Sequence, residues 1–210
     1  KRDIKTYLEG TGDRLLREER YDDAIECFEV AKAAALKRND HEYVSETIFR
    51  EAQILDDIGR HEDAVAMIQS LLTPETQGNT FGKAAMLHLK YLYSDKNYGQ
   101  VLDASIKYQE DERTQNYLPQ ILYITWVAAR LGNTETLAEV TRKQFVKTFP
   151  DHILAADMYF SQAMNSLARS DYQDCQRIIE YIIYKYPNSR LIKRVKEIKE
   201  RITKSTEVKN

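Results

Sequence analysis

The chain has 210 residues, of which 42% are hydrophobic, so it is long enough and apolar enough to bury a core. Its 31 basic and 33 acidic side chains give a net charge of -2, which disfavours a nucleic-acid or phosphate-binding role. Only 7 glycines and 4 prolines are present, few for a chain rich in hairpin turns, so we expect an all-helical protein.

Membrane and targeting signals are absent from the sequence as it stands. No run of about 18 apolar residues occurs, so we expect no membrane span. The sequence begins at Lys1 without an initiator methionine, which suggests a processed or excised fragment. We therefore expect contact with a membrane only through an anchor in a missing part.

A small or β-branched residue recurs at a nearly constant interval. We call these five positions the anchors: Ala24, Ala64, Val101, Ala138 and Cys175. They follow one another by 40, 37, 37 and 37 residues, as expected of a chain built from repeated units.

The first unit shows helical spacing on both sides of a short polar turn. One face before the turn and one after it are marked at intervals of three and four by Leu8, Gly12, Leu15, Ala24, Phe28 and Ala31. This spacing predicts a helical hairpin in which Gly12 allows close packing.

The turns of the later units contain glycine at Gly59 and Gly132, where a helix end favours a left-handed residue. Gly132 lies six residues before its anchor, whereas Gly59 lies five before, so we expect the fourth turn to hold one extra residue. The first helix of that unit would then move back by one position. The longer polar stretches 73–82 and 109–119 are predicted to be loops.

The fourth and fifth units end on prolines, and a charged segment follows. Pro150 and Pro187 each lie twelve residues after an anchor, where proline stops a helix. Residues 188–206 carry an apolar stripe formed by Leu191, Val195, Ile198 and Ile202, surrounded by basic side chains. This pattern favours a capping helix over the last unit; the alternative is a basic amphipathic helix lying on an anionic membrane.

Ala24, together with Gly12, Tyr21, Phe28 and Ala31, resembles the tetratricopeptide repeat (TPR). The last unit, SDYQDCQRIIEYIIYKYP, is similar to it through Tyr172, Ile179, Ile182 and Pro187, with Cys175 as the small residue. The resemblance implies a right-handed α-solenoid in a single domain over residues 1–210. Its five hairpins would cover about 5–40, 45–80, 82–116, 118–152 and 153–187, with a cap at 188–206.

The ending YKYPNSRLIKRVKEIKERI is also similar to the C-terminal units of bacterial cell-envelope repeat proteins. This second resemblance implies a bacterial protein and favours a periplasmic or membrane-anchored location over a cytoplasmic one. The sequence alone does not decide between these compartments.

Residues that could carry catalysis or bind a metal are better explained by structure. Asp22 and Asp23 point about 100° apart on a helix and suit its N-terminus. Cys27 has no histidine near it in sequence, and Cys175 occupies an anchor. The histidines, His41, His61, His88 and His152, show no metal-binding spacing, and His88 suits a hydrogen-bonded, half-buried position. We expect no enzyme, no cofactor and no metal.

The resemblance implies that partners contact the first helix of each unit, fifteen and eleven residues before the anchor. These positions give a partner-binding groove of Phe49, Gln53, Met86, Lys90, Leu122, Trp126, Phe160 and Met164, with Tyr93 one turn further on. Leu122 and Trp126 include the shift of register in the fourth unit. The alternative is that this aromatic stripe belongs to the core. In the first unit the same positions are acidic, Glu9 and Asp13, which disfavours binding of a peptide carboxylate.

The sequence therefore predicts a non-catalytic scaffold that binds a protein or peptide partner in the groove, in a bacterial envelope or secretion assembly. Two alternatives remain open. One is a structural subunit that self-associates into a homo-oligomer, and the other is a regulatory repeat domain excised from a larger enzyme or signalling protein.

Overall fold

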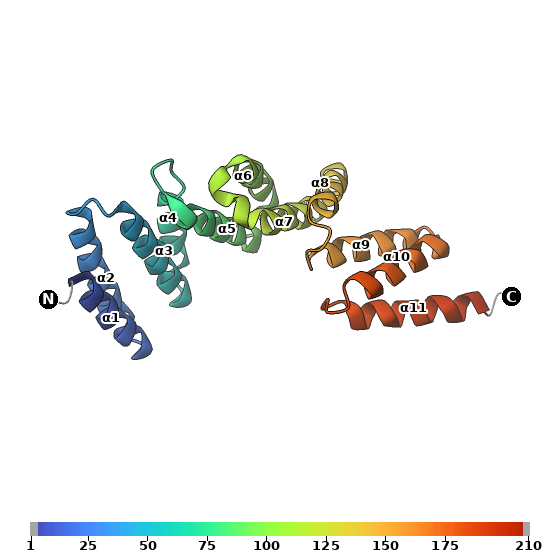
Figure 1. Cartoon of the computed structure of the whole chain (residues 1–210), viewed down its shortest axis with the longest axis horizontal. Helices are drawn as coiled ribbons and strands as arrows, with labels where there is room; N and C mark the ends of the chain where they lie inside the picture. Colours follow the sequence, from blue (N-terminus) through green and yellow to red (C-terminus); the bar gives the residue numbers. More distant parts are fainter. Residues whose placement is uncertain (1–3, 208–210) are drawn as a thin grey trace. The chain divides into compact units, whose positions relative to one another are not determined.

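The computed structural model describes the backbone of residues 4–207 and the side chains of residues 7–203. Within residues 4–207 it contains eleven α-helices, one 3₁₀ helix and no strand, which confirms the prediction of an all-α helical-repeat fold (Figure 1). The chain divides into two compact parts, an N-terminal part up to Ile124 and a C-terminal part from Thr125.

The N-terminal part contains three helical hairpins and a short connecting helix. Its elements are α1 (Ile4–Arg17), α2 (Tyr21–Leu36), α3 (His41–Asp57), α4 (His61–Ser70), α5 (Gly78–Ser94), α6 (Tyr98–Glu110) and the 3₁₀ helix η1 (Glu112–Tyr117). The boundary between the two parts falls within α7 (Leu118–Leu131). The C-terminal part contains the rest of α7, followed by α8 (Glu135–Thr148), α9 (Ala155–Ala168), α10 (Tyr172–Lys185) and α11 (Ile192–Glu207).

All five hairpins turn through the same backbone motif. The fifth residue before each anchor has a left-handed conformation, with φ between 56° and 82°: Glu19, Gly59, Lys96, Asn133 and Ser170. The next residue donates its backbone N–H to the carbonyl five positions earlier, at 2.8 or 2.9 Å in every turn. This bond satisfies a carbonyl that the helix end would leave unpaired, which is the Schellman arrangement. The five turns therefore have equal length.

The prediction for Gly59 is confirmed, whereas the one for Gly132 is wrong. Asn133 takes the left-handed position in the fourth turn, with φ 56°. Asparagine tolerates this conformation because its short side chain can bond locally. Asn133 lies five residues before Ala138, so the fourth turn holds no extra residue, and the predicted shift of register is wrong.

Helical structure also occupies parts of the two stretches predicted to be loops. Helix α5 already begins at Gly78, and η1 followed by the start of α7 fills most of 109–119. The Asp111 side chain caps η1 by accepting a bond from the backbone N–H of Arg113 at 2.9 Å. The prediction of plain loops is therefore wrong in these parts, because polar residues here supply caps.

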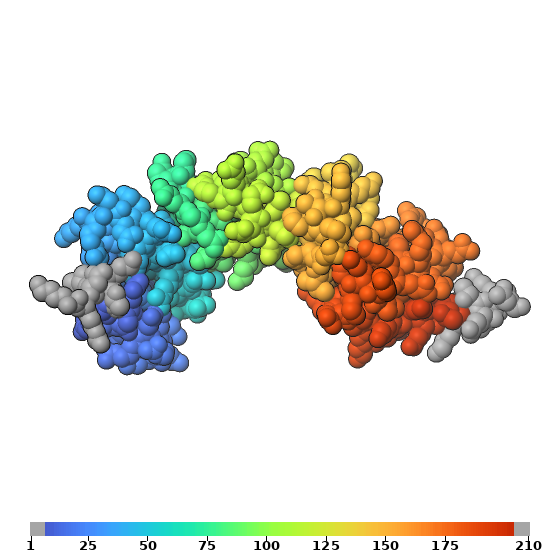
Figure 2. All heavy atoms as spheres, viewed as in Figure 1, coloured from blue at the N-terminus to red at the C-terminus, as the bar shows by residue number. Residues whose placement is uncertain are grey.

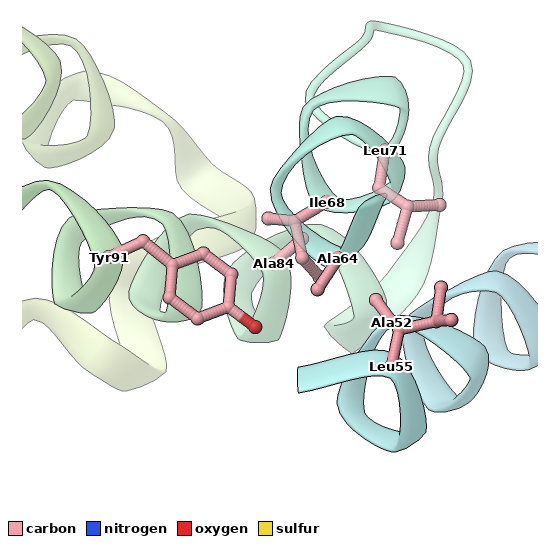
Figure 3. Packing of buried hydrophobic residues seen from close by; sticks show 7 residues of the cluster. All are labelled: Ala52, Leu55, Ala64, Ile68, Leu71, Ala84 and Tyr91. Carbon is pink, nitrogen blue, oxygen red and sulfur yellow. The ribbon is translucent and has the colours of Figure 1, made fainter. Parts of the chain in front are cut away.

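The anchors lie where neighbouring helices make their closest contacts. Four of them have no exposed surface, and Ala138 is 3% exposed. Around Ala64, the buried side chains of α3, α4 and α5 form one cluster with Ala52, Leu55, Ile68, Leu71, Ala84 and Tyr91 (Figure 3). Small residues at the anchors let the two helices of a hairpin approach, and larger ones between them fill the core.

Helices α1 and α2 approach so closely at Gly12 that a side chain would not fit. A Cβ atom added there would lie 2.6 Å from two ring atoms of Phe28, which is 1% exposed. The expectation that Gly12 is a close-packing residue is therefore confirmed. Gly10, on the same helix, has no atom within 4 Å of an added Cβ.

The two glycines form a matched pair for testing this contact. Gly12→Ala is expected to lower the free energy of unfolding by about 1–2 kcal/mol, because overpacking outweighs the gain in helix propensity. Gly10→Ala gains propensity without the clash and should raise it by up to about 1 kcal/mol. Urea titrations followed by circular dichroism measure both changes; equal shifts for the two variants would contradict the close contact.

In the C-terminal part, α9, α10 and α11 pack around an aliphatic centre. Cys175, Ile179 and Ile182 of α10 are fully buried. Helix α11 contacts α10 and buries Val195, and Lys199 on α11 pairs with Glu180 on α10 at 3.0 Å. In the space-filling view, side chains fill the space between the ribbons of α9, α10 and α11, drawn in orange to red (Figure 2). No helix in the described part of the chain is long and apolar enough to cross a membrane.

Candidate protein-interaction surface

The acidic, cysteine and histidine side chains that could carry chemistry lie in structural surroundings. Between residues 7 and 203, no three His, Cys, Asp or Glu side chains come together as metal ligands. Burial raises the pKa of the Cys175 thiol, and the carboxylates of Asp174 and Asp171 add to this, which opposes formation of a reactive thiolate. Asp23 accepts a hydrogen bond from Arg20 at 2.6 Å in the first turn of α2.

His88 is half-buried and hydrogen-bonded, as the sequence suggested. Its Nδ1 lies 2.8 Å from the hydroxyl of Tyr108, which α6 supplies. Burial lowers the pKa of His88 and raises the pKa of Tyr108 to about 12. The pair is therefore uncharged at neutral pH and belongs to the packing between α5 and α6.

The predicted groove residues of the second and third hairpins lie on α3 and α5, two helices in contact with each other. Gln53 and Lys90 are exposed, and Phe49 and Met86 are half-buried. Phe49 also packs against the cluster around Ala64, so part of its side chain belongs to the core. Tyr93 is half-buried, and its ring lies 6.0 Å from that of Tyr98 across the turn to α6.

The acidic positions of α1 are partly neutralised. Asp13 forms an ion pair with Arg50 of α3. The guanidinium of Arg50 lies 4.4 Å from the centre of the Phe28 ring. Arg50 thus joins the first two hairpins by charge and by cation–π contact.

The predicted groove residues of α7 are buried. Leu122 is 1% exposed and Trp126 is 5% exposed. The guanidinium of Arg130, one turn further on, lies 5.2 Å from the centre of the Trp126 ring. Their role in binding stays a prediction, and both side chains have a packing role that would account for them.

In the C-terminal part, the predicted groove residues of α9 lie beside α11. Phe160 is 9% exposed, and the guanidinium of Arg194 on α11 lies 5.3 Å from the centre of its ring. Met164 is half-buried and lines a groove of about 660 Å³. We call this the α9–α11 groove; it is lined by Met164, Leu167, Arg190, Lys193, Arg194, Glu197, Ile198 and Arg201.

Comparison with known proteins finds relatives in structure only. No family model matches the chain, and no curated protein matches its sequence. A tetratricopeptide repeat protein from Parabacteroides merdae superposes with a TM-score of 0.62 at 15% identity, over 95% of this chain and 72% of that one. The chain has the fold of a tetratricopeptide-repeat protein. MamA from Desulfovibrio magneticus RS-1, from residue 41 to its end, superposes with a TM-score of 0.57 at 12% identity, over 90% of this chain and 98% of that one. A double mutant of MamA from RS-1 superposes with a TM-score of 0.57 at 14% identity, over 87% of this chain and 94% of that one.

Because the turns are equal in length, the unshifted positions of α7 also become candidates for partner contact. Counting fifteen and eleven positions back from Ala138 without a shift gives Tyr123 and Val127. Both are half-buried, whereas their neighbours Leu122 and Trp126 are buried. The constant spacing of 37 residues, and the tolerance of asparagine for left-handed backbone, were the signals that could have found them.

Proposed function

We propose that the chain is a non-catalytic interaction scaffold that binds a segment of a partner protein along the first helices of its hairpins. The similarity of its C-terminal unit to cell-envelope repeat proteins extends the proposal to an assembly of the bacterial envelope. The proposal is supported by the TPR fold, in which stacked hairpins offer an extended surface to a partner.

A second, partly exposed apolar face on the first helices carries this proposal. The core faces of α3 and α5 bury Leu55 and Leu89. At three of the five positions that lie fifteen residues before an anchor, the apolar side chains Phe49, Met86 and Tyr123 keep part of their surface exposed. Aromatic and methionine side chains at such positions favour binding of varied partner segments, because they combine a large contact area with adaptable packing.

Selection from a random peptide-display library on the intact chain tests this function. Met86→Glu puts a charge on α5, and Met164→Glu puts one on α9. Each substitution is expected to lower the affinity of selected peptides about tenfold. Ile106→Glu on α6 and Val140→Glu on α8 are matched controls, because Ile106 is 50% and Val140 is 56% exposed on second helices.

All four variants should keep the helical content of the unchanged protein by circular dichroism. The proposal is wrong if the controls weaken the selected peptides as much as the two methionine variants do. It is also wrong if the library yields no peptide that binds. Sedimentation at micromolar concentration accompanies the assay, so that self-association is not mistaken for a property of one chain.

A further inference from the structure

The α9–α11 groove has an apolar floor. Met164 and Leu167 come from α9, and Ile198 comes from α11. All three are half-buried, so part of each side chain is in contact with solvent. With a volume of about 660 Å³, the groove has room for one or more large side chains of a ligand. Apolar surface of this kind gains free energy when a side chain covers it.

The rim of the same groove carries an excess of positive charge. Arg190 pairs with Asp157 at 2.9 Å, so its charge is balanced within the fold. Lys193 and Arg194 also line the groove, against a single lining carboxylate, Glu197. A ligand that carries negative charges beside an apolar side chain would therefore complement both the rim and the floor.

Arg194 is held in place for such a ligand. Its guanidinium stands over the ring of Phe160, which fixes the side chain at the edge of the groove. A guanidinium held in this way binds a carboxylate with less loss of side-chain entropy than a mobile one does. Lys193, on the preceding residue of α11, is exposed and supplies a second donor.

We propose that the α9–α11 groove binds an acidic segment of a partner protein, with an apolar side chain of the segment on Met164, Leu167 and Ile198 and its carboxylates on Lys193 and Arg194. The inference rests on the proposed scaffold function and specifies the chemistry of one part of its surface. A peptide fits better than a lipid surface, because the groove is concave and a side chain can enter it, whereas a lipid surface is broad and flat.

Three fluorescein-labelled peptides of about 14 residues, sized for a groove-bound segment, test the charge rule on the intact chain by fluorescence anisotropy. One combines leucine with glutamate, one leucine with lysine, and one serine with glutamate. The leucine–glutamate peptide is expected to bind at least about tenfold more tightly than either of the others. Its affinity should fall as salt is added.

Two substitutions on the same helix locate the contact. Lys193→Glu reverses a charge that lines the groove, and Lys196→Glu makes the same change at an exposed position of α11 outside the lining. Lys193→Glu should weaken the leucine–glutamate peptide about tenfold, and Lys196→Glu no more than about twofold. Both variants are expected to fold, because both lysines are exposed.

Each other outcome has a definite meaning. Equal weakening by both variants, or equal binding of the lysine peptide, overturns the inference and leaves the scaffold function standing. Vesicles of phosphatidylcholine and phosphatidylserine form a further sample, and binding to them in place of the peptide, lost in Lys193→Glu, also overturns it. If the three peptides fail while the display library yields binders, only the inference fails. If the library also yields none, the scaffold function itself is wrong.

Discussion

Lys32→Met is expected to lower the free energy of unfolding by about 3–5 kcal/mol at neutral pH. Glu51 of α3 has no exposed surface, and its Oε2 atom lies 2.8 Å from the Nζ atom of Lys32 on α2. Methionine preserves the aliphatic packing of the lysine stem but leaves the buried carboxylate without its cation. The other oxygen, Oε1, has no hydrogen-bond partner in the described part of the chain, so nothing else there compensates the charge.

The loss should depend on pH in a defined direction. Burial already raises the pKa of Glu51, against the opposing effect of the hydrogen bond and charge of Lys32. Without Lys32 this pKa rises further, so the folded protein keeps the proton that the unfolded chain releases above about pH 4.3. The deficit of Lys32→Met is thus small near pH 4 and grows as the pH rises to 7. Urea titrations at both pH values measure it.

Two further variants isolate the charge. Adding Glu51→Gln to Lys32→Met removes the buried charge and should recover most of the stability at pH 7. Arg20→Met breaks an exposed pair with Asp23 at the start of the same helix and should change stability by no more than about 1 kcal/mol. If the double variant is as unstable as Lys32→Met alone, lost packing and not the buried charge is the cause.

The helical hairpins could be predicted because their determinants repeat in the sequence. Each hairpin needs a small or compact residue where its two helices make contact. This requirement makes such residues, among them Ala24, Ala64 and Cys175, recur about every 37 to 40 positions in the sequence. Except for Gly59, the turn residues could not be predicted in the same way. Glu19 and Lys96 are left-handed because the hydrogen bond that closes the helix requires it, against their own preference.

The candidate surface was predicted less completely than the fold. Gly132 predicts a left-handed residue one position before the observed one, Asn133, and this shifts the predicted contacts of α7 from the half-buried Tyr123 to the buried Leu122. Lys32 and Glu51 look like surface residues in sequence, because nothing local shows that neighbouring helices enclose them. Likewise, the α9–α11 groove depends on where α11 packs, and this is set by contacts distant in sequence.

Arg113→Ala is expected to lower the free energy of unfolding by about 3 kcal/mol, because it removes several charge-assisted contacts at once. Arg113 belongs to η1, and its Nη1 donates to the carbonyls of Thr73 and Thr76 at 3.0 and 2.7 Å. Its guanidinium also pairs with Asp111 at 2.7 Å and lies 3.5 Å from the centre of the Phe81 ring. One side chain therefore joins the connection between α4 and α5 to the one between α6 and α7.

The loss should be local before it is global. Without Arg113, the carbonyls of Thr73 and Thr76 lose its charged donor, so the exchange of the amide protons of residues 75–77 is expected to accelerate more than that of α2. Arg113→Lys keeps the charge but cannot form the planar fork, and should recover less than half of the stability. Arg60→Ala is the surface control, since its pair with Asp63 is half-exposed and contributes at most about 0.5 kcal/mol. Full recovery by lysine would mean that charge alone, and not the geometry of the guanidinium, holds the two connections together.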